Sequence, residues 1–191
     1  YEGKVADENA PVKPLSLYAK TRIMSEELLA SYVSEYKIVR FGTLYGASPR
    51  MRFDLVANIM TAMAVDGGKI KVNGGEQWRP MTHVRDAAKA IRLLIEKNTS
   101  SNLFNVVGYN YRVSDIAENV AAMTGAEIIK EEKEVDLRNY QVSADRLVKE
   151  VDWHPAFDLR AGIAEIQSLF DFGAFLDWED DHYYNVKILR K

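Results

Sequence analysis

The sequence has no cysteine among its 191 residues, and it has only three histidines. The absence of cysteine excludes disulfide bonds, thiolate metal sites and a cysteine nucleophile. It fits the reducing conditions of the cytoplasm, where we expect the protein to lie. The histidines are scattered, at positions 83, 154 and 182, so they do not provide the spacing of a metal site. We therefore predict no bound metal.

Long hydrophobic runs and an excess of one charge are also missing. No apolar stretch approaches the roughly 20 residues that a membrane helix needs. The chain has 25 basic and 28 acidic residues, a net charge of −3, and the two signs are interspersed. Such a charge distribution gives no basic surface for a polyanion. We therefore expect neither a membrane nor a nucleic acid as a partner.

Hydrophobic residues make up 47% of the chain, which is enough for a core, and their spacing alternates between helical and strand periods. The pattern predicts helices over residues 15–36, 53–66, 86–97, 114–124, 143–151 and 159–172, the last being the final helix. It predicts strands over 37–41, 69–73, 103–107 and 127–130. Helices that connect successive strands are typical of parallel sheets, so we predict an α/β fold with parallel strands in at least its first part.

Two further features of the pattern concern the first part of the chain and the helix ends. The first dozen residues are predicted to form an exposed loop. Gly67-Gly68 and Gly125 are predicted to end the helices over 53–66 and 114–124. The apolar positions of the helix over 15–36 are predicted to form its buried side: Leu17, Ile23, Met24, Leu28, Leu29, Tyr32 and Val33.

Several motifs follow one another along the chain. The first is Tyr18-Ala-Lys20-Thr-Arg22, at a helix start and preceded by Asp7-Glu8-Asn9-Ala10-Pro11. Taken alone, Tyr18 is as well explained as a packed aromatic residue. The others are Val39-Arg-Phe-Gly-Thr-Leu-Tyr-Gly46, Gly74-Gly-Glu-Gln-Trp-Arg-Pro-Met-Thr-His-Val-Arg-Asp-Ala-Ala88, Phe104-Asn-Val-Val-Gly108, and Asp136-Leu-Arg-Asn-Tyr140 followed by His154-Pro155. In this order, and across nearly its whole length, the chain resembles the extended short-chain dehydrogenases that act on nucleotide sugars.

The resemblance implies part of a Rossmann-like parallel sheet with a smaller α/β substrate-binding lobe. Residues 1–50 would be the remainder of the NAD-binding domain, and residues 51–191 mostly the substrate-binding lobe, interleaved with returning Rossmann elements. The N-terminal dinucleotide-binding half, with its glycine-rich phosphate loop and the catalytic serine or threonine, is expected upstream of residue 1. The cofactor is expected to be NAD or NADP, and the partner a nucleotide-diphosphate sugar.

The resemblance also implies an activity, that of an NAD(P)-dependent nucleotide-sugar epimerase, dehydratase or reductase. Tyr18 would take a proton from a sugar hydroxyl while hydride passes to the cofactor. A tyrosine with a pKa near 10 is a poor base at pH 7, so a neighbouring cation has to stabilise its phenolate. Arg22 stands where the family has lysine, and arginine differs from lysine in size and geometry. The alternative is a non-catalytic nucleotide-sugar-binding or structural homologue that has lost that lysine.

Site residues are carried over position by position. Tyr18 and Arg22 are expected to be catalytic. The cofactor would contact Tyr18, Arg22, Phe41, Gly42, Thr43 and Tyr45, and the substrate would contact Asp54, Leu55, Arg79, Arg138 and Tyr140. The two arginines of the substrate group suit a diphosphate because a guanidinium donates two hydrogen bonds, although either could be a solvated surface residue.

Four remaining interpretations concern structure more than chemistry. Asp54 could favour a helix N-terminus instead of contacting substrate. Tyr140 and Trp78 could be core aromatics, and His83 is interpreted as a structural residue. The acidic stretch over residues 177–185 is interpreted as a solvated loop. We also expect a homodimer, to which the helix over 15–36 would contribute, as in the family.

Overall fold

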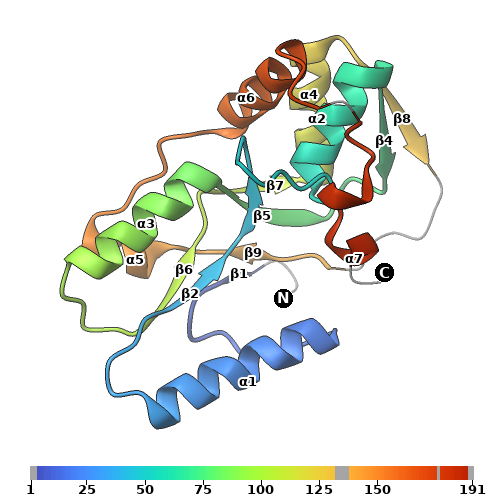
Figure 1. Ribbon diagram of the computed structural model, residues 1–191. Helices are drawn as coiled ribbons and strands as arrows, with labels where there is room; N and C mark the ends of the chain where they lie inside the picture. The colour runs from blue at the N-terminus through green and yellow to red at the C-terminus, as the bar shows by residue number, and fades with distance from the viewer. Residues whose placement is uncertain (1–3, 132–137, 176, 189–191) are drawn as a thin grey trace.

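The computed structural model describes residues 4–131, 138–175 and 177–188 (Figure 1). Its strands are β1 (Val5–Ala6), β2 (Ile38–Phe41), β3 (Thr43–Tyr45), β4 (Lys69–Asn73), β5 (Trp78–His83), β6 (Leu103–Val106), β7 (Tyr109–Arg112), β8 (Glu127–Glu131) and β9 (Gln141–Val142). Its helices are α1 (Leu17–Tyr32), α2 (Val56–Gly67), α3 (Val84–Glu96), α4 (Val113–Thr124), α5 (Asp145–Val151), α6 (Leu159–Asp171), the 3-10 turn η1 (Asp181–Tyr183) and α7 (Asn185–Ile188).

Strand pairing is mostly parallel, as predicted. β2 pairs with β6, β3 with β5, β4 with β8 and β1 with β9, all parallel. β5 also pairs with β7, and this pair is antiparallel. The α/β prediction is confirmed. The division at residue 50 stays a prediction.

The helix ends follow local chemistry. The Ser16 hydroxyl accepts a hydrogen bond from Ala19 N (3.2 Å), so α1 begins after an N-cap. Gly68 and Gly125 end α2 and α4 with φ of 64° and 75°, the left-handed conformation that glycine adopts without strain. Both predicted stops are confirmed, because this signal is local.

Other predictions about the chain are wrong in detail. The first dozen residues are not simply an exposed loop, because β1 pairs with β9 and Glu8 is 7% exposed. α6 is not the final helix, since η1 and α7 follow it. No strand is predicted over β1, β3, β5, β7 or β9. β1, β3, β7 and β9 have two to four residues each, too few for a period to show. β5 has six residues, but polar and apolar side chains alike are buried along it, so it shows no alternation.

Three groups of buried side chains hold the molecule together. The largest lies among α2, α4, α6, β4 and β5 and includes Met60, Ile70, Met81, Ile116 and Ile163. A second joins α3, α5 and β6 around Phe104, Leu147 and Trp153. A third surrounds Phe53 and receives aromatic side chains from the chain after α6. Each such side chain, fully buried, contributes on the order of 1.5–3 kcal/mol.

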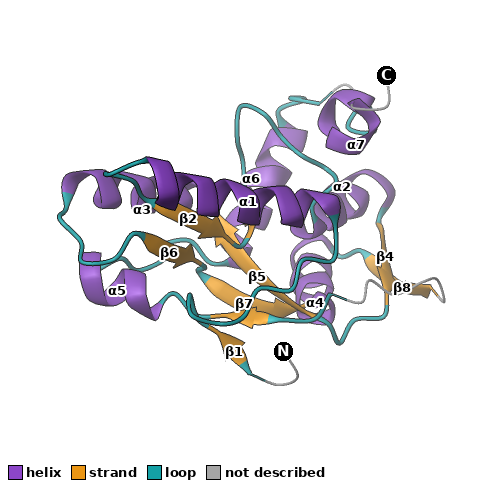
Figure 2. Ribbon diagram, turned by 90° about the horizontal axis from the view of Figure 1, so that it is seen from below, coloured by secondary structure: helices purple, strands orange, loops and turns teal. Residues whose placement is uncertain are grey.

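Helix α1 lies along one side of the molecule, away from the α2, α4 and α6 layer (Figures 1 and 2). No residue of α1 is buried. The predicted buried side is therefore wrong for the described chain: Ile23 is half-buried, and the other six positions are exposed, Leu17 at 77% and Tyr32 at 83%. A helix forms where the apolar spacing predicts it, but none of the described elements covers this face. Among the described residues, no helix is long and apolar enough to cross a membrane.

Candidate functional site

Tyr18 lies in the first turn of α1 and is 69% exposed. One helical turn later, the guanidinium carbon of Arg22 lies 5.0 Å from the centre of the Tyr18 ring. A cation over an aromatic face is attracted to the ring. Lys20, two positions after Tyr18, projects from a different side of the helix. Tyr18 and Arg22 are thus the two predicted catalytic residues that the fold does bring together.

The loop before α1 is fastened to the sheet by a buried carboxylate. Glu8 Oε1 accepts a hydrogen bond from Asn105 N of β6 (2.8 Å), and Glu8 Oε2 lies 3.6 Å from Arg146 Nε of α5. Arg146 also donates to Asn9 Oδ1 (3.0 Å). These contacts fix the loop that leads toward Tyr18. The sequence shows Glu8 in a motif but not its partners, which are about 100 and 140 positions away.

The end of β2 is the predicted cofactor side. Phe41 is 40% exposed and Thr43 is half-buried. A Cβ on Gly42 would lie 2.9 Å from Pro80 O and 3.0 Å from Thr82 Oγ1, and Gly42 N donates to Val106 O (3.0 Å). Gly42 is therefore explained by the close approach of β5. Phe41 and Thr43 retain surface at this strand end.

Tyr45, another of the predicted cofactor residues, is buried. Its side chain is 1% exposed, its hydroxyl donates to Phe157 O (3.0 Å), and its ring lies against Gly162 of α6. Burial, with help from the neighbouring Tyr111, raises the pKa of Tyr45 above its usual value. α6 covers the ring, so the Tyr45 side chain does not face the open end of β2. A cofactor contact of Tyr45 stays a prediction.

The Arg79 side chain contacts the main chain of Arg138. Arg79 is 8% exposed, so the alternative of a solvated surface arginine is wrong for it. Its Nη1 donates to Trp78 O (2.9 Å) and to Arg138 O. Trp78 N donates to Asn139 Oδ1 (3.0 Å), so residues 138–140 run beside β5. Arg138 is exposed and Tyr140 half-buried; positions 136 and 137 of this motif lie outside the described residues.

Asp54 and Leu55 precede α2. The N-cap is Leu55 and makes no side-chain cap bond, so the interpretation of Asp54 as a helix N-terminal residue is not supported. The Asp54 carboxylate accepts instead from Arg52 Nε (3.0 Å) and Nη2 (2.9 Å), and from Asn185 N (3.3 Å). The acidic stretch over 177–185 is thereby more than a solvated loop, because part of it contacts the predicted substrate side.

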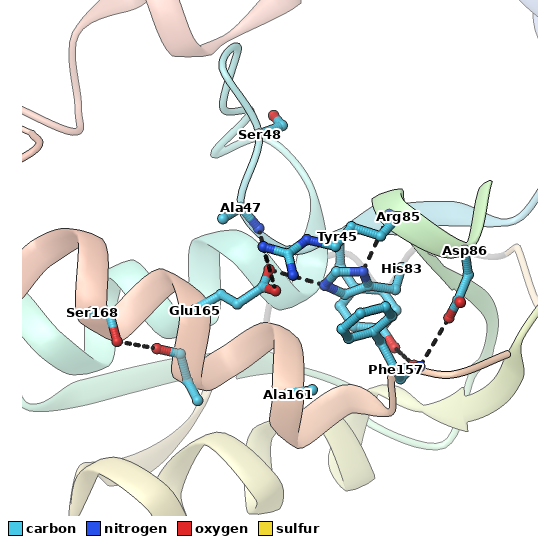
Figure 3. A network of polar contacts seen from close by, with 12 residues as sticks. Tyr45, Ala47, Ser48, His83, Arg85, Asp86, Phe157, Ala161, Glu165 and Ser168 are labelled. Carbon is cyan, nitrogen blue, oxygen red and sulfur yellow. Dashed lines mark hydrogen bonds and ion pairs between the residues drawn. The ribbon is translucent and has the colours of Figure 1, made fainter. Parts of the chain in front are cut away.

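A partly buried network links the strand ends to α6 (Figure 3). His83 Nδ1 accepts from Arg85 N (3.2 Å), so the ring hydrogen is on Nε2, which lies 3.0 Å from Glu165 Oε2 and donates to it. Glu165 also accepts from Ala47 N (3.0 Å), and its Oε1 lies 3.3 Å from Arg85 Nη2. One carboxylate thus joins α6, the loop after β3 and the start of α3.

The surroundings of His83 explain its place in the fold. It is 1% exposed, and its ring stacks on Phe157 with centres 4.5 Å apart. Gly46 has φ of 98°, and a Cβ there would lie 2.3 Å from His83 Nε2. Asp86, also 1% exposed, accepts from the main chain of Ala156 and Phe157 (3.0 Å each). The structural interpretation of His83 is confirmed. Its partner Glu165 is 82 positions away, and no sequence signal indicated it.

Two further observations concern the described part of the chain. No group of three or more His, Cys, Asp or Glu residues is placed to hold a metal ion among these residues. An open cavity of about 450 Å³ lies between α1 and the strands β2 and β6, lined among others by Glu26, Tyr36, Leu103 and Arg146. It lies two helical turns or more from Tyr18, so it is separate from the tyrosine and its cation.

Comparisons with known proteins support the family resemblance. The family described as "NAD dependent epimerase/dehydratase family" matches residues 2–124. A putative UDP-glucose 4-epimerase of Methanocaldococcus jannaschii is 27% identical over 171 residues, which cover 84% of this chain and 55% of that protein. The chain therefore spans little more than half the length of this relative.

Solved structures show the same fold. MoeE5 in complex with UDP-glucuronic acid and NAD has a TM-score of 0.76 at 22% identity, over 88% of this chain and 60% of its own. The dTDP-glucose 4,6-dehydratase of Bacillus anthracis, in complex with NAD, has a TM-score of 0.76 at 19% identity, over 98% and 60% of the two chains. The predicted Rossmann-like α/β fold is confirmed by these neighbours.

Proposed function

Because the chain belongs to the NAD-dependent epimerase/dehydratase family, we propose that it supplies the sugar-side part of an enzyme that epimerises, dehydrates or reduces a nucleotide sugar with NAD or NADP. The names of its relatives support this choice: one is a putative UDP-glucose 4-epimerase and another a dTDP-glucose 4,6-dehydratase. The observation that carries the proposal is the exposed Tyr18 at the start of α1 with Arg22 beside its ring.

Tyr18 is the proposed acid–base group. A phenol with an ordinary pKa near 10 is mostly protonated at pH 7, so it needs nearby positive charge to act as a base. Arg22 supplies one such charge. Tyr18 would accept the proton of a sugar hydroxyl as the hydrogen on the same carbon leaves, and return it in the reverse step. Its exposure leaves the ring open to a substrate.

One end of a dinucleotide is proposed to lie near the start of α1 and the end of β2. Tyr18, Arg22, Phe41 and Thr43 have exposed or half-buried side chains near the ends of α1 and β2, and they are the residues that would hold the nicotinamide end. The cofactor, when bound, supplies the hydride acceptor and donor. The 191 residues contain no Gly-x-x-Gly-x-x-Gly turn, so we assign no site for the pyrophosphate of the dinucleotide to these residues. Tyr45 is left out because its ring is buried.

Arg138 and Arg79 are proposed to serve the diphosphate of the substrate. Arg138 is exposed, and a guanidinium donates paired hydrogen bonds to phosphate oxygens. Arg79 is buried and donates to the main-chain carbonyl of Arg138, so it positions the segment from behind. Tyr140, Asp54 and Leu55 are the further residues proposed to contact the sugar nucleotide.

A second candidate function is favoured by Arg22. A homologue that binds nucleotide sugars without turnover could keep the fold and tolerate arginine at this position. Arg22→Lys separates the two functions in the whole protein. An enzyme turns over before the change and after it, whereas a homologue that is inactive because it lost the lysine has no turnover before the change.

The first experiment is a ligand screen on the whole protein. UDP-, GDP-, CDP- and dTDP-glucose are added in turn with NAD, and thermal unfolding is followed together with product formation. A ligand that binds only the folded state raises the unfolding temperature by mass action. We expect one nucleotide to give a shift and a changed sugar. No shift with any of the sugars tested, and no product, would contradict the proposal.

We also propose that the protein works as a homodimer in the cytoplasm. The support comes from α1, where Leu17, Met24, Leu28 and Tyr32 form an exposed apolar stripe at helical spacing. Exposed apolar stripes of this kind mark interaction surfaces.

A further inference from the structure

The chain after α6 is built into the loop that precedes α2. Phe53, in this loop, is 0% exposed. Its ring lies 5.1 Å from that of Phe175, 5.7 Å from that of Trp178 and 5.4 Å from that of Tyr183, centre to centre. Since three of its ring neighbours come from beyond α6, the position of Phe53 depends on residues more than 120 positions later in the sequence.

Main-chain and polar side-chain contacts also join the chain after α6 to the loop before α2. We call residues 177–187 the C-terminal segment. Phe53 N donates to Tyr183 O (3.1 Å), Asn185 N donates to Asp54 Oδ2 (3.3 Å), and Arg50 Nη2 donates to Asn185 Oδ1 (3.1 Å). The segment is itself folded by η1 and α7, and Trp178 Nε1 bonds Asp66 Oδ2 of α2 (3.2 Å).

These contacts control the orientation of charged groups. Asp54 Oδ2 accepts hydrogen bonds from Asn185 N and from Arg52 Nη2. The segment therefore helps to fix the Asp54 carboxylate, and this carboxylate orients the Arg52 guanidinium. The Arg52 side chain is 38% exposed, and that of Asp54 is 19% exposed. At the other end of the loop, Ala47 N is held by Glu165. The loop over residues 48–54 is thus fixed at both ends, and one of the two fixed points is the C-terminal segment.

We infer that the C-terminal segment is a positioning element for nucleotide-sugar binding, which acts by holding Phe53, Asp54 and Arg52 in place. The inference rests on the proposed function, because it assumes that the loop before α2 faces the sugar nucleotide. Tyr183 and Asn185 are positioning residues, since they act through the loop. Tyr18, to which proton transfer is assigned, lies outside this segment. Loss of the segment should therefore lower affinity for the nucleotide sugar more than affinity for the cofactor.

The test compares Tyr183→Ala with Tyr183→Phe in the whole protein. Affinities for UDP-glucose, dTDP-glucose and NAD are measured by calorimetry, and hydrogen exchange is followed at the amides of residues 53–55. We expect Tyr183→Ala to weaken binding of the nucleotide sugar by about tenfold or more, as loss of a packed aromatic contact would. NAD affinity should stay within about twofold, and exchange at Phe53 should rise. Tyr183→Phe keeps the ring and should bind like the unaltered protein.

Asn185→Ala is the milder variant. It removes the side-chain bond to Arg50 and leaves the aromatic rings intact, so it should fold even if Tyr183→Ala does not. We expect it to weaken sugar binding by about threefold to tenfold. Unchanged sugar affinity in both folded variants would overturn the inference, as would equal losses of sugar and NAD affinity. If the unaltered protein binds neither sugar, the proposed function fails, and this outcome is distinct from the other two.

Discussion

Single residues in this protein are constrained by close approaches that join distant parts of the chain. Because Gly162 of α6 has no Cβ, the ring of Tyr45 can pack against it, and Gly46 leaves room for the ring of His83 in the same way. The Glu165 carboxylate contacts donor groups of Ala47, His83 and Arg85, which belong to three different parts of the fold. The motif sequence identified Tyr45 and His83, but it could not show that α6 covers them. That information lies in the pairing of residues more than 80 positions apart, which a single sequence does not display.

Gly162→Ala is expected to destabilise the fold. A Cβ at this position would lie 2.5 Å from Tyr45 Cδ2, and the ring is 1% exposed and has no room to move. The free energy of unfolding in urea should fall by about 1–3 kcal/mol. Gly67→Ala is the matched control, because nothing lies within 4 Å of a Cβ there. It should leave stability unchanged or raise it by up to about 1 kcal/mol. Equal effects of the two changes would contradict the packing argument.

Glu165→Ala removes the shared acceptor of the network. His83 Nε2 and Ala47 N would lose their partner in a buried place, so unfolding free energy should fall by about 2–3 kcal/mol. Exposed Glu118 of α4 provides the comparison. Glu118→Ala should stay within about 0.5 kcal/mol of the unaltered protein. Calorimetric unfolding of both variants measures the difference, and a Glu165→Ala value inside the Glu118→Ala range would refute the role of Glu165.

Alkaline pH should weaken the protein, partly through Tyr184. Burial, followed by the charges of Glu179 and Asp54, raises the pKa of Tyr184 to about 12 from 10.0. The unfolded state then loses this proton before the folded state does, so the contribution to stability is present below pH 10 and is lost as the pH rises toward 12. Unfolding free energies of the unaltered protein and Tyr184→Phe, measured from pH 8 to 12, should decline less steeply in the variant. Parallel declines would show that Tyr184 contributes nothing.

At the scale of elements, the sequence predicted the long helices well and the short strands poorly. α2 and α4 have clear apolar periods and end at Gly68 and Gly125, both local signals. β3 and β7 exist because β5 lies between them, which a local pattern cannot reveal. α1 shows a third case. Its helical period was evident, yet whether an apolar face is covered depends on neighbours that a periodicity does not specify.

The exposed stripe of α1 gives a prediction about assembly. Leu28 is 56% exposed in the centre of the stripe, and a charge there should prevent association of two copies. We expect the unaltered whole protein to be dimeric by light scattering and Leu28→Glu to be monomeric. Ile95→Glu, at an apolar position of α3 that is 79% exposed, should stay dimeric. A dimer that survives Leu28→Glu would place the interface elsewhere.

At the scale of the whole molecule, parallel strands bring together residues that are distant in the sequence. The end of β2 and the loop before Tyr18 meet at β6, because Gly42 N and Glu8 both bond residues of that strand. The predicted substrate residues lie in two other places, beside β5 and before α2. The family and the fold could be predicted from ordered motifs. The contribution of the C-terminal segment could not, because its acidic composition indicated solvent exposure and its aromatic residues had no visible partner.

The central claim is that Tyr18 exchanges a proton with a nucleotide sugar, and Tyr18→Phe tests it most directly. Turnover of the nucleotide sugar identified by the ligand screen is measured in the whole protein, with Tyr32→Phe, an exposed tyrosine of the same helix, as the control. Loss of a general acid–base group should lower kcat by about a hundredfold to ten-thousandfold, with little change in sugar affinity. Tyr32→Phe should keep normal turnover. A Tyr18→Phe variant that turns over at the unaltered rate would contradict the account.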